Sequence, residues 1–134
     1  MALTRSLRNA VLALSLLLAL ALAGAFDAAR AQALSDADRN AIHGVIQSQL
    51  NAFRRDDSGT AFGFAAPAIQ SMYGSPEMFL EAVRRAYRPV YRPRQVEFRD
   101  LKTIDGAIVQ QVYVVGPDNE PKLALYIMER QPDG

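Results

Sequence analysis

The sequence contains no cysteine and only one histidine, and these two shortages exclude several kinds of site. Without cysteine the chain has no disulfide, no thiolate nucleophile and no lipidated cysteine near its start. Structural zinc sites take their ligands mainly from cysteine and histidine, so His43 alone is too little to build one. We therefore expect no metal and no cofactor, and the fold has to rely on its hydrophobic core.

Neither positive nor negative charge is in large excess. The whole chain has a net charge of +1, and its excess of basic residues belongs to residues 1–31, which hold Arg5, Arg8 and Arg30 against one acid, Asp27. Without that segment the net charge is −1. A near-neutral domain gives no general reason to expect nucleic acid or an anionic membrane as a partner. We expect no nucleic-acid partner, and contact with a membrane only during export.

Residues 1–31 have the three-part pattern of a secretory signal peptide. Two arginines precede an apolar run over residues 10–23, and small residues then lead to Ala31. The alternative is an uncleaved membrane anchor, but the run is shorter than the roughly 20 residues that span a bilayer. We predict cleavage after Ala31, a periplasmic or secreted protein, and a single domain over residues 34–134.

Helical spacing of apolar residues dominates the first half of this domain. Ser35 is a suitable N-cap, and the apolar stripe after it predicts a helix that ends near Arg55. Shorter helical pieces are predicted over residues 60–65 and 67–72, and Gly74 ends the second of them. The stripe of the first helix consists of Ile42, Val45, Ile46, Leu50 and Phe53.

A further helix is predicted to begin with Ser75 as its N-cap and Pro76 in its first turn. It should end near Tyr87, because Pro89 disfavours helical geometry at the residue before it. Pro93 disfavours helical geometry at Arg92 in the same way. We therefore predict that residues 88–93 form an extended corner leading into the first strand.

Beyond the corner the apolar period changes from 3.6 to 2. Strands are predicted over residues 96–101, 108–115 and 122–129, and the Asp105–Gly106 pair predicts a tight hairpin between the first two. Helices followed by an antiparallel meander indicate an α+β fold. We expect N-terminal helices packed on one face of a curved antiparallel sheet.

The end of the sequence is unusual. Residues 131–134 have the composition of a tight turn, but no strand follows, so the third strand would keep an unpaired edge near Leu123, Leu125 and Ile127. Three explanations are open: the chain is truncated, a neighbouring subunit lends a strand, or the tail frays. We favour truncation at the C-terminus, with the last strand missing.

Three stretches carry a resemblance to a known family. They are LSDADRNAIHGVIQSQLNAFRRDD, AFGFAAPAIQSMYGSPEMFLEAVRRAYRPVYRPR and GPDNEPKLALYIMERQPDG. Together they resemble an uncharacterised bacterial exported family, domain of unknown function 4864, over nearly all of residues 34–134. The resemblance implies a cystatin-like cone of the nuclear transport factor 2 type, with a long helix in the mouth of a bent sheet. It also implies a further strand containing tryptophan, and it supplies no catalytic motif to transfer.

No pattern in the sequence marks a catalytic site, and we predict no catalytic residues. His43 lies beside the apolar stripe of the first helix, which suits a packing or surface residue, and no strand-turn-helix setting for a nucleophile is present. Asp56 and Asp57 could supply a general base only in a desolvated cavity. Their arginine, serine and glycine neighbours instead indicate a solvated turn.

Five arginines lie between residues 84 and 94, with two tyrosines among them and no acid. Such a cluster could hold a carboxylate or a phosphate by bidentate hydrogen bonds. A solvated helix face accounts for the first three arginines. Arg92 and Arg94, beside Tyr91 and outside the predicted helix, are the better candidates for binding.

The resemblance, together with apolar residues that could line it, implies a concave pocket, and we expect an exported non-enzymatic domain that binds a small molecule or a protein partner in this apolar pocket with an Arg/Tyr rim. The alternative is an isomerase- or dehydratase-like enzyme of the same cone fold with a buried carboxylate. A homodimer through the sheet is a third hypothesis. The pocket lining is predicted to include Phe62, Phe64, Met72, Tyr73, Tyr113 and Tyr126. The candidate ligand-binding residues are Tyr73, Tyr87, Tyr91, Arg92, Arg94, Tyr113 and Tyr126.

Overall fold

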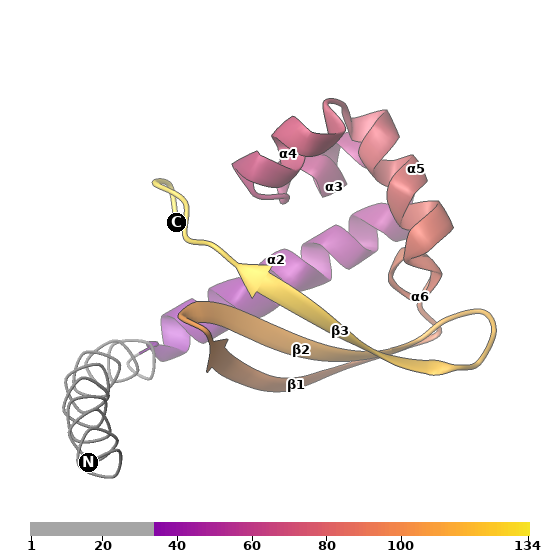
Figure 1. Cartoon of the computed structure of the whole chain (residues 1–134). Coiled ribbons are helices and arrows are strands. Elements are labelled where there is room, and N and C mark those ends of the chain that lie inside the picture. Colours follow the sequence, from indigo (N-terminus) through magenta and orange to yellow (C-terminus); the bar gives the residue numbers. More distant parts are fainter. Residues whose placement is uncertain (1–33) are drawn as a thin grey trace, which may run out of the picture. The chain divides into compact units, whose positions relative to one another are not determined.

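The computed structural model describes residues 34–134, so the predicted signal peptide lies outside the described residues. None of the helices within the described range is both long and apolar enough to cross a membrane. Helices come first along this range and an antiparallel sheet follows, which confirms the predicted α+β class (Figure 1). The elements are α2 (Asp36–Arg54), α3 (Ser58–Gly63), α4 (Pro67–Tyr73), α5 (Pro76–Ala86), α6 (Arg88–Tyr91), β1 (Gln95–Ile104), β2 (Ala107–Val115) and β3 (Pro121–Met128).

Local side-chain hydrogen bonds set the helix starts. The Ser35 hydroxyl accepts from the Asp38 N–H while the Asp38 carboxylate accepts from the Ser35 N–H, which forms a capping box at the start of α2. Ser75 caps α5, and Gly74 ends α4 in the left-handed conformation at φ 78°. The helix predicted to begin at residue 60 begins earlier, because Asp57 acts as its N-cap.

The prediction of an extended corner over residues 88–93 is wrong, because the short helix α6 occupies most of it. Pro89 lies in the first turn of α6, where a missing N–H costs no hydrogen bond and the fixed φ of proline is already helical. The break in the helical backbone therefore falls earlier, at Tyr87, whose φ is −128° and ψ 48°.

The sheet has the order β1-β2-β3, with both pairs of neighbours antiparallel. The predicted hairpin is confirmed: Asp105 at φ 50° and Gly106 at φ 79° form the two-residue turn between β1 and β2. The pairing of β1 with β2 is shifted between Phe98 and Leu101, whereas β2 and β3 pair without a shift. The two edge strands thus differ in regularity.

The core consists of two clusters, and α2 contributes to both. The helical cluster contains Ala52, Phe53, Ala61, Phe79 and Val83. The sheet cluster contains Ile46, Leu50, Val112 and Val114. Val90 of α6 packs against both clusters. The predicted first helix is therefore the element on which the other helices and the sheet are both packed.

Candidate functional site

The predicted ligand-binding residues lie in several separate places. Tyr73 packs edge-on against Phe79 in the helical cluster, with 5.5 Å between ring centroids. Tyr113 lies on the sheet face opposite α2, where the Arg99 guanidinium is 5.0 Å from its ring centroid. Arg94 donates a hydrogen bond to Asn119 in the turn before β3. These three residues do not share a site.

Tyr91 and Arg92 are brought together, and they meet at Asp56. The Tyr91 hydroxyl donates to one carboxylate oxygen of Asp56, and Arg92 donates to the other at 2.9 Å. Arg92 also donates to the Phe53 carbonyl, and its guanidinium lies 3.9 Å from the Tyr91 ring centroid. The group joins the end of α2 to α6 and holds Asp56 in the left-handed region at φ 54°. We call it the Asp56 joint.

The Asp56 joint predicts a dependence of stability on pH. The hydrogen bond from Tyr91, followed by that from Arg92, lowers the pKa of Asp56 below its usual value. Such a carboxyl stabilises the folded state above its unfolded pKa of about 4, and this contribution is lost as the pH falls through the folded pKa. We expect Asp56→Asn to melt at a lower temperature than the natural chain at pH 7, with a difference that shrinks below about pH 4. Melting followed by circular dichroism over a pH series would test this, and a difference independent of pH would contradict it.

A pocket of about 220 Å³ lies beside the joint and is lined in part by Glu77, Glu81 and Arg84. Two of its charged groups are paired, because Glu81 forms ion pairs with Arg84 in the pocket and with Arg85 beside it. The hydrogen bond from Arg84 lowers the pKa of Glu81. These arginines thus form the solvated helix face that the sequence predicted as the alternative to a binding cluster.

A larger, open groove of about 640 Å³ lies between the first half of α2 and β1. His43 stands in it as an exposed residue, with its ring centroid 3.7 Å from that of Phe98. Over the part of the chain that the structure describes, no hydrogen bond or ion pair joins His43 to a carboxylate. The groove therefore offers a stacked aromatic pair, without the acid that would orient a catalytic histidine.

Gln110 is a structural residue at this groove that the sequence only partly indicated. Successive residues of a strand face opposite sides of the sheet, so only one of Gln110 and Gln111 can face inward, and alternation alone does not say which. Gln110 is the buried one, and its side-chain N–H group donates to the carbonyls of Arg99 and Asp100 at 3.0 and 3.4 Å. It thereby holds the irregular part of β1, where backbone carbonyls would otherwise lack strand partners.

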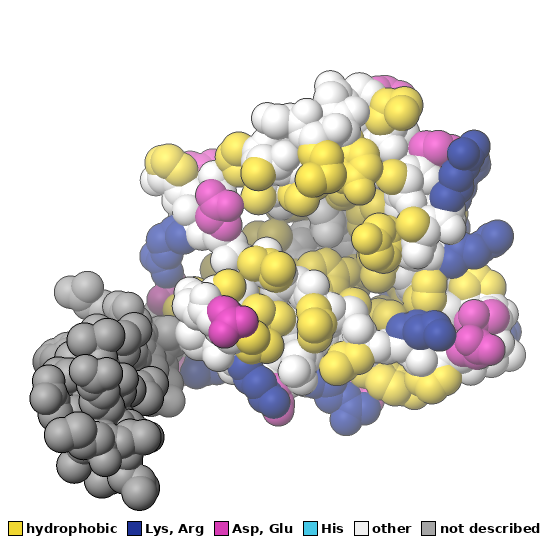
Figure 2. Space-filling view, in the orientation of Figure 1, with side chains coloured by type: hydrophobic (Ala, Val, Ile, Leu, Met, Phe, Trp, Pro, Cys, Tyr) yellow, Lys and Arg dark blue, Asp and Glu magenta, His cyan; other side chains and the backbone are white. Residues whose placement is uncertain are grey.

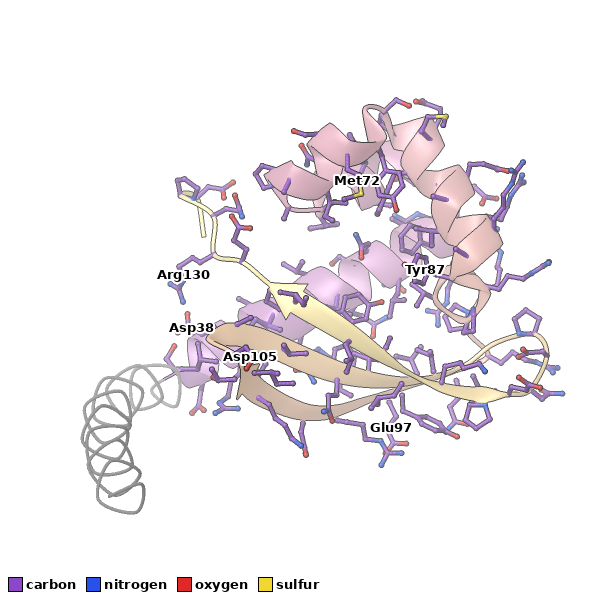
Figure 3. The ribbon with its side chains drawn as sticks, in the orientation of Figure 1. Asp38, Met72, Tyr87, Glu97, Asp105 and Arg130 are labelled. Carbon is purple, nitrogen blue, oxygen red and sulfur yellow. The ribbon has the colours of Figure 1, made fainter. Side chains whose placement is uncertain are left out.

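The third concave feature lies between helices α3–α5 and β3, and we call it the hollow. Figure 2 shows this depression with apolar side chains on both sides of it. Met72 and Tyr87 are 71% and 57% exposed, and they lie on the side of the helices that faces β3 (Figure 3). On the strand, alternation turns Ala124, Tyr126 and Met128 toward α2, where they pack against the sheet cluster. The hollow is thus bordered by apolar groups from two different layers.

Tyr126 contributes one polar group to this region. Its hydroxyl is buried and has no hydrogen-bond partner among the described residues, and burial raises the pKa of Tyr126 to about 12. A buried hydroxyl without a partner costs about 1–3 kcal/mol. Of the predicted ligand-binding residues, Tyr87 lies at the hollow, whereas Tyr126 packs against the sheet cluster with its hydroxyl buried.

Comparison with known families adds one finding. Residues 35–134 match the family described as domain of unknown function (DUF4864). The chain belongs to this family. The resemblance stated from the sequence is thus confirmed, while the cone-shaped closure of the sheet stays a prediction. No match was found among curated proteins or among solved structures.

Four carboxyls of this DUF4864 domain are held in their ionised form by neighbouring side chains. The carboxyls of Asp38, Asp56, Asp57 and Glu81 all have a pKa below the usual value, in each case chiefly through a hydrogen bond from a neighbouring side chain. A carboxyl that acts as a general base near pH 7 needs a raised pKa. Within residues 34–134 no group of three potential ligands could hold a metal ion.

Proposed function

We propose that the protein is a non-catalytic binding domain that takes up an apolar small molecule in the hollow. The observation that carries this proposal is the exposure of Met72 and Tyr87 on the side of the helices that faces β3. Large apolar side chains gathered around a depression are typical of ligand sites, where burial of the ligand removes apolar surface from water. Methionine suits such a site because its flexible side chain adapts to different shapes.

The polar part of the proposed site is smaller than the Arg/Tyr rim expected from the sequence. Arg92 is engaged in the Asp56 joint and Arg94 with Asn119, so neither guanidinium is needed for the proposal. Tyr87, which is 57% exposed, remains as the polar group at the border of the hollow.

Export belongs to the same proposal. It rests on the signal-like pattern of residues 1–31, which combines two early arginines, an apolar run and small residues before Ala31. The domain would then meet its ligand in the periplasm or outside the cell. Protein for the binding test is therefore taken from the periplasmic extract and the culture medium, and its absence from both would overturn the export part alone.

The binding test uses the fluorescent apolar probe anilinonaphthalene sulfonate and a variant of the hollow. The natural chain should bind the probe saturably, and Met72→Asp should weaken the binding about tenfold or more, which corresponds to about 1.4 kcal/mol. The reason is that the substitution sets a charge where the probe would displace water from apolar surface. Fluorescence titration measures both dissociation constants.

Met78→Asp is the matched control. Met78 is 61% exposed, and helical spacing sets it on the charged side of α5 with Glu81 and Arg85. This variant should bind the probe as the natural chain does, and all three proteins should melt at similar temperatures. Equal weakening by both substitutions would show that the probe binds elsewhere and would overturn the proposal.

A further inference from the structure

The open groove of about 640 Å³ between the first half of α2 and β1 is separate from the hollow. It lies at the β1 edge of the sheet, with β2 between β1 and β3. Sites for small molecules have volumes of about 300–1,000 Å³ and combine an apolar lining with a few polar groups. Both kinds of residue line the groove, since Phe98 and Leu101 are apolar and Arg39 and Gln110 are polar.

Gln110 keeps one hydrogen-bond acceptor unused at this groove. The residue is only 6% exposed, and its side-chain nitrogen donates to the backbone carbonyls of Arg99 and Asp100. Because only the amide nitrogen can donate, the side-chain oxygen is left as an acceptor, and no described residue donates to it. Within residues 34–134 the Tyr126 hydroxyl is the one buried side-chain polar atom without a partner. The Gln110 oxygen therefore retains contact with solvent, on the side where the residue lines the groove.

The groove also has one positive charge to spare. Lys102 pairs with Asp100 at 3.5 Å, and Arg99 pairs with Glu97 at 3.1 Å. Arg39 is exposed, and its guanidinium forms no ion pair or hydrogen bond with any residue of the described range. A guanidinium binds one carboxylate through two parallel hydrogen bonds. The charge of the groove therefore suits a ligand with a single carboxylate.

An aromatic surface lies beside this charge. Arg39 and His43 are four residues apart within α2, so they lie on the same side of the helix, one turn apart. The ring of His43 packs against that of Phe98, with 3.7 Å between the centroids and 35° between the planes. Because His43 is nevertheless exposed, the part of its ring turned away from Phe98 is open to a flat ligand.

We propose that the groove binds a small aromatic carboxylate that carries a hydroxyl or N–H group. The carboxylate pairs with Arg39, the ring stacks on His43, and the hydroxyl or N–H donates to the side-chain oxygen of Gln110. This site is independent of the ligand proposed for the hollow, because the groove is lined by α2, β1 and β2, whereas the hollow lies between helices α3–α5 and β3.

The probe for this site is para-hydroxybenzoate, which has all three features. Calorimetric titration of the natural chain should show saturable binding of one molecule. Benzoate lacks the donor for Gln110 and should bind about fivefold more weakly, and para-hydroxybenzamide lacks the charge and should bind about tenfold more weakly. The ligand is varied here because a substitution of Gln110 would also release the carbonyls of Arg99 and Asp100.

Arg39→Gln tests the charged contact, with Arg88→Gln as its matched control. Arg39→Gln should weaken the binding of para-hydroxybenzoate about tenfold or more. Arg88 is also exposed and without an ion pair among the described residues, but it does not line the groove. Its substitution changes the net charge equally and should leave the dissociation constant unchanged. Equal weakening by both variants would indicate a general attraction of charge and overturn the proposal.

Two further variants test the ring contact and the place of binding. His43→Ala should weaken the binding of para-hydroxybenzoate, whereas His43→Phe, which keeps an aromatic face, should retain it. Met72→Asp should leave it unchanged, because Met72 lies at the hollow. Weakening by Met72→Asp would locate the probe in the hollow and overturn the proposal. Equal affinities for para-hydroxybenzoate and benzoate, or no binding of para-hydroxybenzoate by the natural chain, would also overturn it.

Discussion

Replacing Phe53 by alanine is expected to lower the free energy of unfolding by about 3–5 kcal/mol. Phe53 is fully buried near the end of α2, and its ring centroid lies 5.9 Å from that of Phe79 on α5. Its loss would leave a cavity in the helical cluster, whose buried residues come from α2, α3 and α5, and these helices cannot all move inward together. Denaturation by urea, followed by circular dichroism, measures the change.

Phe64→Ala is the control for this substitution. Phe64 is 38% exposed at the end of α3, so its side chain leaves little of a cavity, and we expect a loss below about 1 kcal/mol. If Phe53→Ala cost no more than Phe64→Ala, the helical cluster could not be the part of the core that holds α5 on α2.

Gly116→Ala is expected to destabilise the fold by about 1–3 kcal/mol, although it adds a single methyl group. A Cβ at this buried position would lie 2.9 Å from the Cα of Pro89 and 3.1 Å from its ring. Backbone atoms of α6 would have to move, because Gly116 is the point at which the turn after β2 meets that helix. The glycine is therefore required for a close approach of two chain segments.

Gly44→Ala supplies a control of opposite sign. Gly44 lies within α2, and a Cβ there would meet nothing within 4 Å. Alanine forms helices better than glycine by about 1 kcal/mol, so this variant should be more stable than the natural chain. Urea denaturation of both variants tests the pair of expectations. A loss of stability in Gly44→Ala would show that the space around a Cβ does not decide the effect of these substitutions.

Features that depend on neighbouring residues could be predicted from the sequence. The capping box at Ser35 and the Asp105–Gly106 hairpin use contacts within a few residues, and the structure contains both. Even the error at residues 88–93 was local, since proline both disfavours helix in the residue before it and favours the first turn of a new one. Neither preference alone decides whether residues 88–93 are extended or helical.

The candidate site depends on contacts that the sequence does not indicate. Arg92 was predicted to be free for a ligand, but its partner Asp56 is 36 residues earlier in the chain. Arg94 likewise bonds to Asn119, which is 25 residues later. Tyr91 and Arg92 looked like a binding pair because they are adjacent, whereas their polar groups are used to join α2 to α6. Long-range pairing of this kind has no local pattern.

The division of the core into two clusters has a consequence for how a ligand could enter. Helices α3–α5 pack chiefly through the helical cluster, and the strands pack through the sheet cluster, so the two sides of the hollow are held by different side chains. Thermal fluctuations could loosen helices α3–α5 while the strands keep their backbone pairing. Access to the interior would then be governed by the opening rate of a few short helices, without global unfolding.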